Sequence, residues 1–137
     1  MFVLLKSYFK TLPALLLLLT LGCVTSIPPV TPEQIARADY GKVPARTIYQ
    51  EAVKDYMQGV LFDPYTAYYR FFGEPQKGYV RISGTKNPSP VFGYLVQVGI
   101  DAKNLKGSYV GEHPYRFLIK NETLYLLNSS DNAEVVP

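Results

Sequence analysis

The chain has 137 residues, which is room for one domain of ordinary size. Hydrophobic residues make up 47% of the chain and charged residues 18%, a globular balance that excludes an intrinsically disordered protein. The formal net charge is +3, and it falls to +1 when the two lysines of the N-terminal segment, Lys6 and Lys10, are set aside. That charge is too small to predict a nucleic-acid partner or a strongly acidic one.

Residues 1–22 have the organisation of a signal peptide. Lys6 and Lys10 form a positively charged start, and Leu12–Gly22 is an apolar run of 11 residues. A membrane-spanning helix needs about 20 apolar residues, so this run is too short to be one. The segment therefore predicts an exported chain whose mature part begins near Cys23.

Cys23 is the single cysteine, and it follows directly after the apolar run. The stretch Leu19–Cys23 resembles the lipobox of bacterial lipoproteins, although Thr20 stands where that family favours leucine. The resemblance implies that the chain is cut before Cys23 and carries lipid on its thiol. In that family an aspartate after the cysteine favours the inner membrane, so Val24 implies the outer membrane, facing the periplasm. The alternatives are cleavage at a nearby site and an unpaired free thiol.

Residues 23–30 contain two prolines, which predict an extended tether. A single domain follows over residues 31–128, and we expect the polar residues 129–137 to be a flexible tail. Thr31 as N-cap and Pro32 at the first helical position predict a short helix that ends near residues 40–41.

The main helix is predicted from about Pro44 to Gln58. Apolar residues recur every four positions in two adjacent stripes: Ile48, Ala52, Tyr56 and Val60, and Tyr49, Val53 and Met57. Together they predict a broad buried face with charged residues opposite. We expect Gly59 to end the helix in a backbone conformation with positive φ.

After Ala67 the sequence alternates with a period of two. Tyr68–Phe72 and Tyr79–Ile82 predict two short strands, separated by a turn over residues 73–78 that contains Gly and Pro. The segment Val91–Ala102 predicts the longest strand, with one apolar face.

Such a strand is expected at the centre of an antiparallel sheet, with a helix on the apolar face. Tyr115–Lys120 and Thr123–Leu127 predict a hairpin that turns about Asn121 and Glu122. The expected fold is α+β, an antiparallel sheet of about four or five strands with one main amphipathic helix packed on it.

Two motifs lie outside these regular patterns, Asp63-Pro64-Tyr65-Thr66-Ala67 and the segment Asp101–Gly111. Together they resemble a pattern found in small, mostly uncharacterised bacterial exported proteins, roughly Asp-Pro-x-Ser-Ala followed by Asn-Ala-Lys-Asn-x-x-Gly-x-Tyr-x-Gly. This chain departs from the pattern at Thr66, Asp101 and Ser108. The resemblance implies a domain type and no particular activity.

The second motif supplies the candidate binding surface, which consists of Lys103, Asn104 and Tyr109. Loops carry binding sites more often than the elements they connect. The alternative is structural: Asn104 would satisfy backbone groups of its own turn, and Tyr109 would pack over the sheet edge. We also expect Asp63 to accept hydrogen bonds from backbone amides that follow it.

No catalytic or metal-binding pattern stands out. His113 is the only histidine, and a triad with Ser108 and Asp101 can be written, but no nucleophile-elbow pattern surrounds Ser108. Ligand spacing for a metal and glycine loops for phosphate are both lacking in the sequence. We therefore expect no metal, no cofactor and no enzymatic activity, and a small hydrolase is the less favoured reading.

These patterns favour a membrane-anchored periplasmic lipoprotein that is held by lipid on Cys23. We expect it to act as a binding or accessory subunit of a cell-envelope assembly, with an envelope protein as its partner. The alternative is a module that binds cell-wall glycan or peptide through exposed tyrosines, namely Tyr65, Tyr68, Tyr69 and Tyr79.

Overall fold

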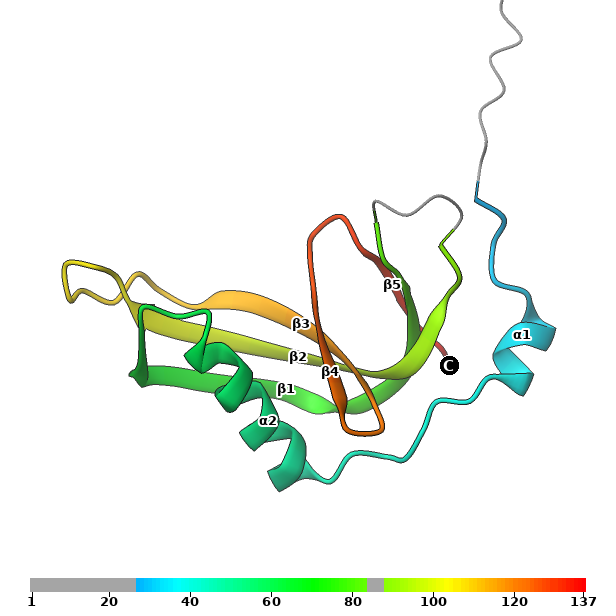
Figure 1. Ribbon diagram of the computed structural model, residues 1–137, viewed down its shortest axis with the longest axis horizontal. Coiled ribbons are helices and arrows are strands. Elements are labelled where there is room, and N and C mark those ends of the chain that lie inside the picture. Colours follow the sequence, from blue (N-terminus) through cyan, green and yellow to red (C-terminus); the bar gives the residue numbers. More distant parts are fainter. Residues whose placement is uncertain (1–26, 84–87) are drawn as a thin grey trace, which may run out of the picture.

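The computed structural model describes residues 27–83 and 88–137, so the predicted signal peptide and Cys23 lie outside the described residues. Five strands form one antiparallel sheet in the order β4-β3-β2-β1-β5 (Figure 1). The elements are α1 (Pro32–Arg37), α2 (Arg46–Gln58), β1 (Asp63–Arg81), β2 (Val91–Lys103), β3 (His113–Lys120), β4 (Thr123–Leu127) and β5 (Asn132–Val135).

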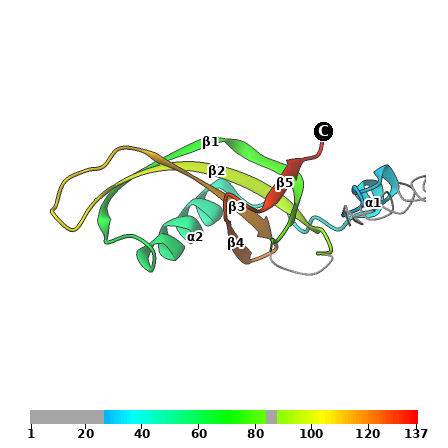
Figure 2. The ribbon, with the colours of Figure 1, turned by 90° about the horizontal axis from the view of Figure 1, so that it is seen from above.

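The antiparallel sheet is confirmed, and β2 is the central strand, as its alternating pattern predicted. Strand predominates over helix more than the α+β prediction anticipated. The long strands curl, α2 lies on one side of them, and α1 lies at the end opposite the β2–β3 loop (Figures 1 and 2). Within the described residues, no helix is both long and apolar enough to cross a membrane.

The helix α1 begins where its sequence predicts. The Thr31 hydroxyl accepts a hydrogen bond from the Gln34 amide, and the Gln34 side chain accepts one from the Thr31 amide, which forms a capping box. The helix ends at Arg37, earlier than predicted. Beyond it, the Tyr40 ring packs edge-on against Phe92 of β2, with ring centroids 5.6 Å apart, and this contact ties the segment to the sheet.

Only one of the two predicted apolar stripes of α2 is buried. Val53 and Met57 are fully buried, whereas Ile48 remains 66% exposed. The sheet offers α2 a single surface, so residues one position away from the contact line stay in solvent. The prediction for Gly59 was wrong, because its φ is −85°. The chain leaves the helix through a turn in which the Leu61 amide donates to the Met57 carbonyl.

The predicted turn over residues 73–78 is wrong. Both of the predicted strands pair with β2, so they form one strand, β1. Phe72 lies opposite Gln97 and Gln76 lies opposite Leu95, so the intervening residues of β1 bulge outward. Gly73 adopts a φ of +65° there. A bulge uses the same Gly-rich composition as a hairpin turn, but the strand continues in its original direction.

The sheet buries side chains on both faces. Phe117 and Leu118 are neighbours on β3 and therefore point to opposite faces, yet both are fully buried. Phe117 packs with α2 residues, whereas Leu118 packs with Val80 and Leu127 inside the curl at the β5 end. The curl therefore supplies a second small core that needs no helix.

The predicted flexible tail, residues 129–137, is also wrong, because it contains β5. Ala133 lies opposite Val80 of β1, and β5 completes the second core. Asp131 leads into the strand and is only 5% exposed. Its carboxylate accepts hydrogen bonds from the Ser83 amide at 2.9 Å and the Asn128 amide at 2.8 Å. A strand that depends on long-range pairing is hard to predict from so short and polar a segment.

We predict that Asp131→Asn destabilises the fold by about 1–3 kcal/mol, because an amide nitrogen would then face a backbone N–H donor. Hydrogen bonds from the Ser83 amide hold the pKa of Asp131 below its usual 3.8, against the opposing effect of burial, with further help from the Asn128 amide. Because the folded-state pKa of Asp131 lies below 3.8, its contribution to stability is fully present above pH 3.8. This contribution is lost as the pH falls from 3.8 through the lower, folded-state pKa.

Urea unfolding between pH 2 and pH 7 measures both effects. The free energy of unfolding of the wild type should fall on the acid side. The variant should have a lower free energy of unfolding at pH 7 and a flatter dependence on pH. Equal stability of the two proteins at pH 7 would contradict the assignment.

Candidate functional site

The two sequence motifs meet at one end of the sheet, which we call the motif end (residues 63–68 and 101–111). Asp63 lies opposite Lys103 in the β1–β2 pairing, and the Tyr109 hydroxyl donates a 2.8 Å hydrogen bond to the Thr66 carbonyl. Lys103 and Tyr109 also form an isolated bridge across the loop. Segments some forty positions apart in the sequence therefore form one surface.

Asn104 shapes the loop between β2 and β3. Its side-chain oxygen accepts hydrogen bonds from the Lys106 amide at 2.9 Å and the Ser108 amide at 3.2 Å. Its own amide donates to the Ser108 carbonyl at 2.9 Å, and Gly107 has a φ of +78°. Glycine adopts this backbone conformation without steric cost. The side-chain oxygen of Asn104 is thus occupied within its own turn.

Two of the three departures from the motif, at Asp101 and Thr66, keep the oxygen atoms that the local structure uses. Asp101 accepts a 3.0 Å hydrogen bond from the Gly111 amide, which the side-chain oxygen of an asparagine could also accept. Asp63 accepts a 2.8 Å hydrogen bond from the hydroxyl of Thr66, a group that serine shares. The expected capping of backbone amides by Asp63 is replaced by this side-chain contact.

An exposed aromatic pair lies beside these contacts. The rings of Tyr68 and Tyr109 are 5.3 Å apart at 38°, and Lys103 Nζ lies 5.2 Å from the Tyr109 ring centroid. Tyr68 is 67% exposed and Tyr109 is 41% exposed. Tyrosine presents a large apolar area with a polar tip, and a cation over a ring face is attracted to it.

The same face continues along β1. The Arg70 guanidinium lies 4.4 Å from the Phe72 ring centroid and pairs with Glu112 through two contacts, one of them a 2.8 Å Nε–Oε2 hydrogen bond. Hydrogen bonding from Arg70 lowers the pKa of Glu112. Glu112 reaches across β2 above Gly99, where a Cβ would collide with its carboxyl group. We name Tyr68, Arg70, Phe72, Lys103 and Tyr109 the outer-face platform.

Sequence reasoning found Lys103 and Tyr109 of this platform but missed Arg70. The signal was present, because Tyr68, Arg70 and Phe72 alternate with the residues that point toward α2. Their importance depends on Lys103 and Tyr109 lying beside them, and that requires the β1–β2 register.

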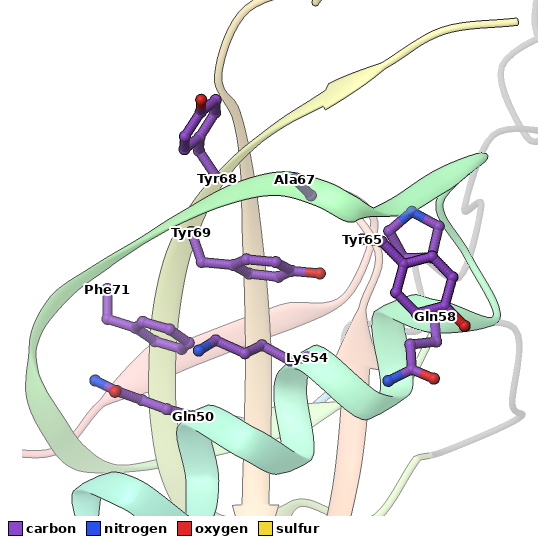
Figure 3. Close-up of a pocket in the computed structure, with 9 residues that line it drawn as sticks. Gln50, Lys54, Gln58, Tyr65, Ala67, Tyr68, Tyr69 and Phe71 are labelled. Atoms are coloured by element: carbon purple, nitrogen blue, oxygen red, sulfur yellow. The ribbon is translucent and has the colours of Figure 1, made fainter.

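A second surface lies on the other side of β1. A cleft of about 460 Å³ separates β1 from α2, and Figure 3 shows Tyr69 and Phe71 pointing into it while Tyr68 points away. From α2, the cleft is lined by Gln50, Lys54 and Gln58. We call it the α2–β1 cleft.

The structure does not assemble the triad written for a small hydrolase. Across residues 27–83 and 88–137, no hydrogen bond or ion pair links His113 to Ser108 or Asp101, and Asp101 is occupied by the Gly111 amide. The same residues contain no group of three His, Cys, Asp or Glu side chains that could hold a metal ion.

Comparison with protein-family models, with curated proteins and with solved structures gave no match to this chain. The function is therefore argued from the geometry of the outer-face platform and the α2–β1 cleft.

We predict that Asn104→Ala speeds amide hydrogen exchange at Lys106 and Ser108 by roughly tenfold, because each amide loses its acceptor. Lys103→Ala is the matched control and should leave both rates unchanged. Exchange followed by NMR measures the rates residue by residue. Equal rates in Asn104→Ala and wild type would show that the turn does not depend on this side chain.

Proposed function

We propose that this protein is an exported lipoprotein, anchored in the outer membrane through lipid on Cys23, whose domain binds an envelope protein as an accessory subunit of a larger assembly. The observation that carries the binding role is the meeting of the two motifs in an exposed surface of aromatic and cationic side chains, the outer-face platform.

The composition and the rigidity of the platform support this role. Tyrosine and arginine are among the residues most enriched where protein interfaces gain their affinity. Tyr109 is fixed by its hydrogen bond to the Thr66 carbonyl, and Arg70 is fixed by Glu112. Side chains that are already ordered lose little conformational entropy on binding.

The second candidate is a module that binds cell-wall glycan or peptide. The observation in its favour is the tilted pair of rings, Tyr68 and Tyr109, with Lys103 beside it and Asp101 opposite Tyr68 in the strand register. An aromatic face with polar groups at its border suits the amphipathic surface of a sugar. Tyr79 is excluded from this surface, because it is only 6% exposed.

For the anchor, we predict that Cys23→Ser abolishes incorporation of labelled palmitate and moves the protein from the membrane to the soluble fraction. Each buried CH₂ group of a lipid chain contributes about 0.8 kcal/mol of membrane affinity, so the anchor depends on the acyl chains. Ser26→Ala, three positions further on, is the control and should keep the label. Label retained in Cys23→Ser would refute lipidation at this residue.

For the platform, we predict that Tyr68→Ala combined with Lys103→Ala weakens partner capture by tenfold or more, since truncation of residues at the centre of an interface costs about 2 kcal/mol each. Leu105→Ala combined with Lys106→Ala is the matched control, because both residues are exposed in the same loop outside the platform. In-cell cross-linking followed by mass spectrometry measures the enrichment.

Loss of one envelope protein in the platform variant alone is the expected result. Retention on purified peptidoglycan that is lost in the platform variant would favour the glycan candidate. Equal behaviour of the platform variant and wild type in both assays would overturn a binding role for the platform.

A further inference from the structure

β1 has an open edge beside the α2–β1 cleft. β5 pairs only with Gly78–Arg81, so, among the residues that the structure describes, the preceding part of β1 has β2 on one side and no strand on the other. Between the two register shifts, Tyr68–Phe72 pair regularly with β2. In antiparallel pairing, alternate residues of such a segment direct their backbone N–H and C=O groups away from the partner strand.

The usual protection of such an edge lies on either side of Tyr68–Phe72 and leaves this segment open. Proteins protect exposed edges with prolines, bulges and charges that point inward. Pro64 and Pro75 stand outside the regular segment Tyr68–Phe72, and both register shifts lie outside it too. The charge of Arg70 belongs to the outer face, where Glu112 neutralises it. What remains is a segment rich in aromatic residues, which favour strands and can receive another one.

The α2–β1 cleft lies where the side chains of an added strand would go. Tyr69 and Phe71 point from β1 toward α2, and the Lys54 side chain extends from α2 alongside these rings (Figure 3). Every second side chain of a strand added at this edge would point to the α2 face of the sheet. The cleft has a volume of about 460 Å³, with aromatic rings on its β1 side and the polar side chains of Gln50, Lys54 and Gln58 on its α2 side. An apolar side chain of the added strand would pack against the rings of β1.

The charge in the cleft favours an acidic occupant. Lys54 Nζ lies 6.0 Å from the Tyr69 ring centroid, and in the described part of the chain it makes no ion pair. The nearby Arg46 differs, because Glu74 pairs with it. Lys54 is exposed at the border of the cleft, and a carboxylate on the incoming strand would give it an opposite charge there.

The same cation argues against a second copy of this chain at the edge. Two β1 edges paired antiparallel about Tyr68 and Tyr69 would bring both Lys54 side chains to the same face near the symmetry axis. Like charges brought together in this way disfavour the pairing.

From these observations we infer that the open edge of β1 binds an extended acidic segment of another protein as an additional strand, with an apolar side chain in the α2–β1 cleft and a carboxylate at Lys54. Binding by strand addition gains affinity from the backbone and specificity from alternate side chains. The site is separate from the outer-face platform, which lies on the opposite face of β1.

The test uses two fluorescein-labelled pools of heptapeptides, built from Val, Thr and Phe, with either Glu or Lys at the central position. Fluorescence polarisation with the full-length protein in detergent should show that the Glu pool binds at least about tenfold more tightly than the Lys pool. Lys54→Glu should invert this preference. Lys106→Glu, which changes an exposed cation outside the cleft, is the control and should leave the preference unchanged.

Amide hydrogen exchange locates the bound peptide. Slower exchange within residues 65–72 on addition of the Glu pool is expected, and Lys103→Ala should keep this binding even if it abolishes capture by the platform. The inference fails if neither pool binds saturably, if Lys54→Glu leaves the preference unchanged, or if slowed exchange lies elsewhere. A dimer that protects the same amides without peptide would assign the edge to a second copy and also overturn it.

Discussion

β1 and β2 pair along nearly their whole lengths, from Asp63 opposite Lys103 to Val80 opposite Val91. This one ladder brings the two motifs together at one end and places Val80 in the second core at the other. It also provides the surface on which α2 buries Val53 and Met57. A shift of the register by one residue would exchange the faces of every side chain, so the core and both candidate surfaces depend on it.

The alternation along β1 gives one strand two surfaces with different chemistry. Tyr68, Arg70 and Phe72 face outward, whereas Tyr69 and Phe71 face α2. Arg70 and Tyr68 of the first set are ordered by Glu112 and Tyr109 from the β2–β3 loop, so this area is rigid. The second set borders the α2–β1 cleft, next to the edge of β1 that has no partner strand among the described residues. A rigid surface such as the outer-face platform suits a folded partner. A cleft beside an open strand edge suits an extended one.

Local sequence predicted the elements whose signals are local. The β3–β4 turn formed at Asn121, which has a φ of 55°, and the capping box at Thr31 started α1. The bulge at Gly73 was mistaken for a turn because Gly and Pro mark both, and only pairing with β2 distinguishes them. Lys103 and Tyr109 were found because their motif is contiguous. Arg70 and the cleft were not, because they require contacts between distant segments.

The position of α1 affects how far the outer-face platform lies from the proposed lipid anchor. α1 lies at the end of the sheet opposite the β2–β3 loop, where Tyr40 contacts Phe92 (Figures 1 and 2). β1 has 19 residues, and the outer-face platform lies toward its motif end, away from α1. With the proposed lipid on the N-terminal side, the sheet would act as an arm that holds the outer-face platform away from the bilayer. A partner could then be engaged at a distance from the membrane without touching lipid itself.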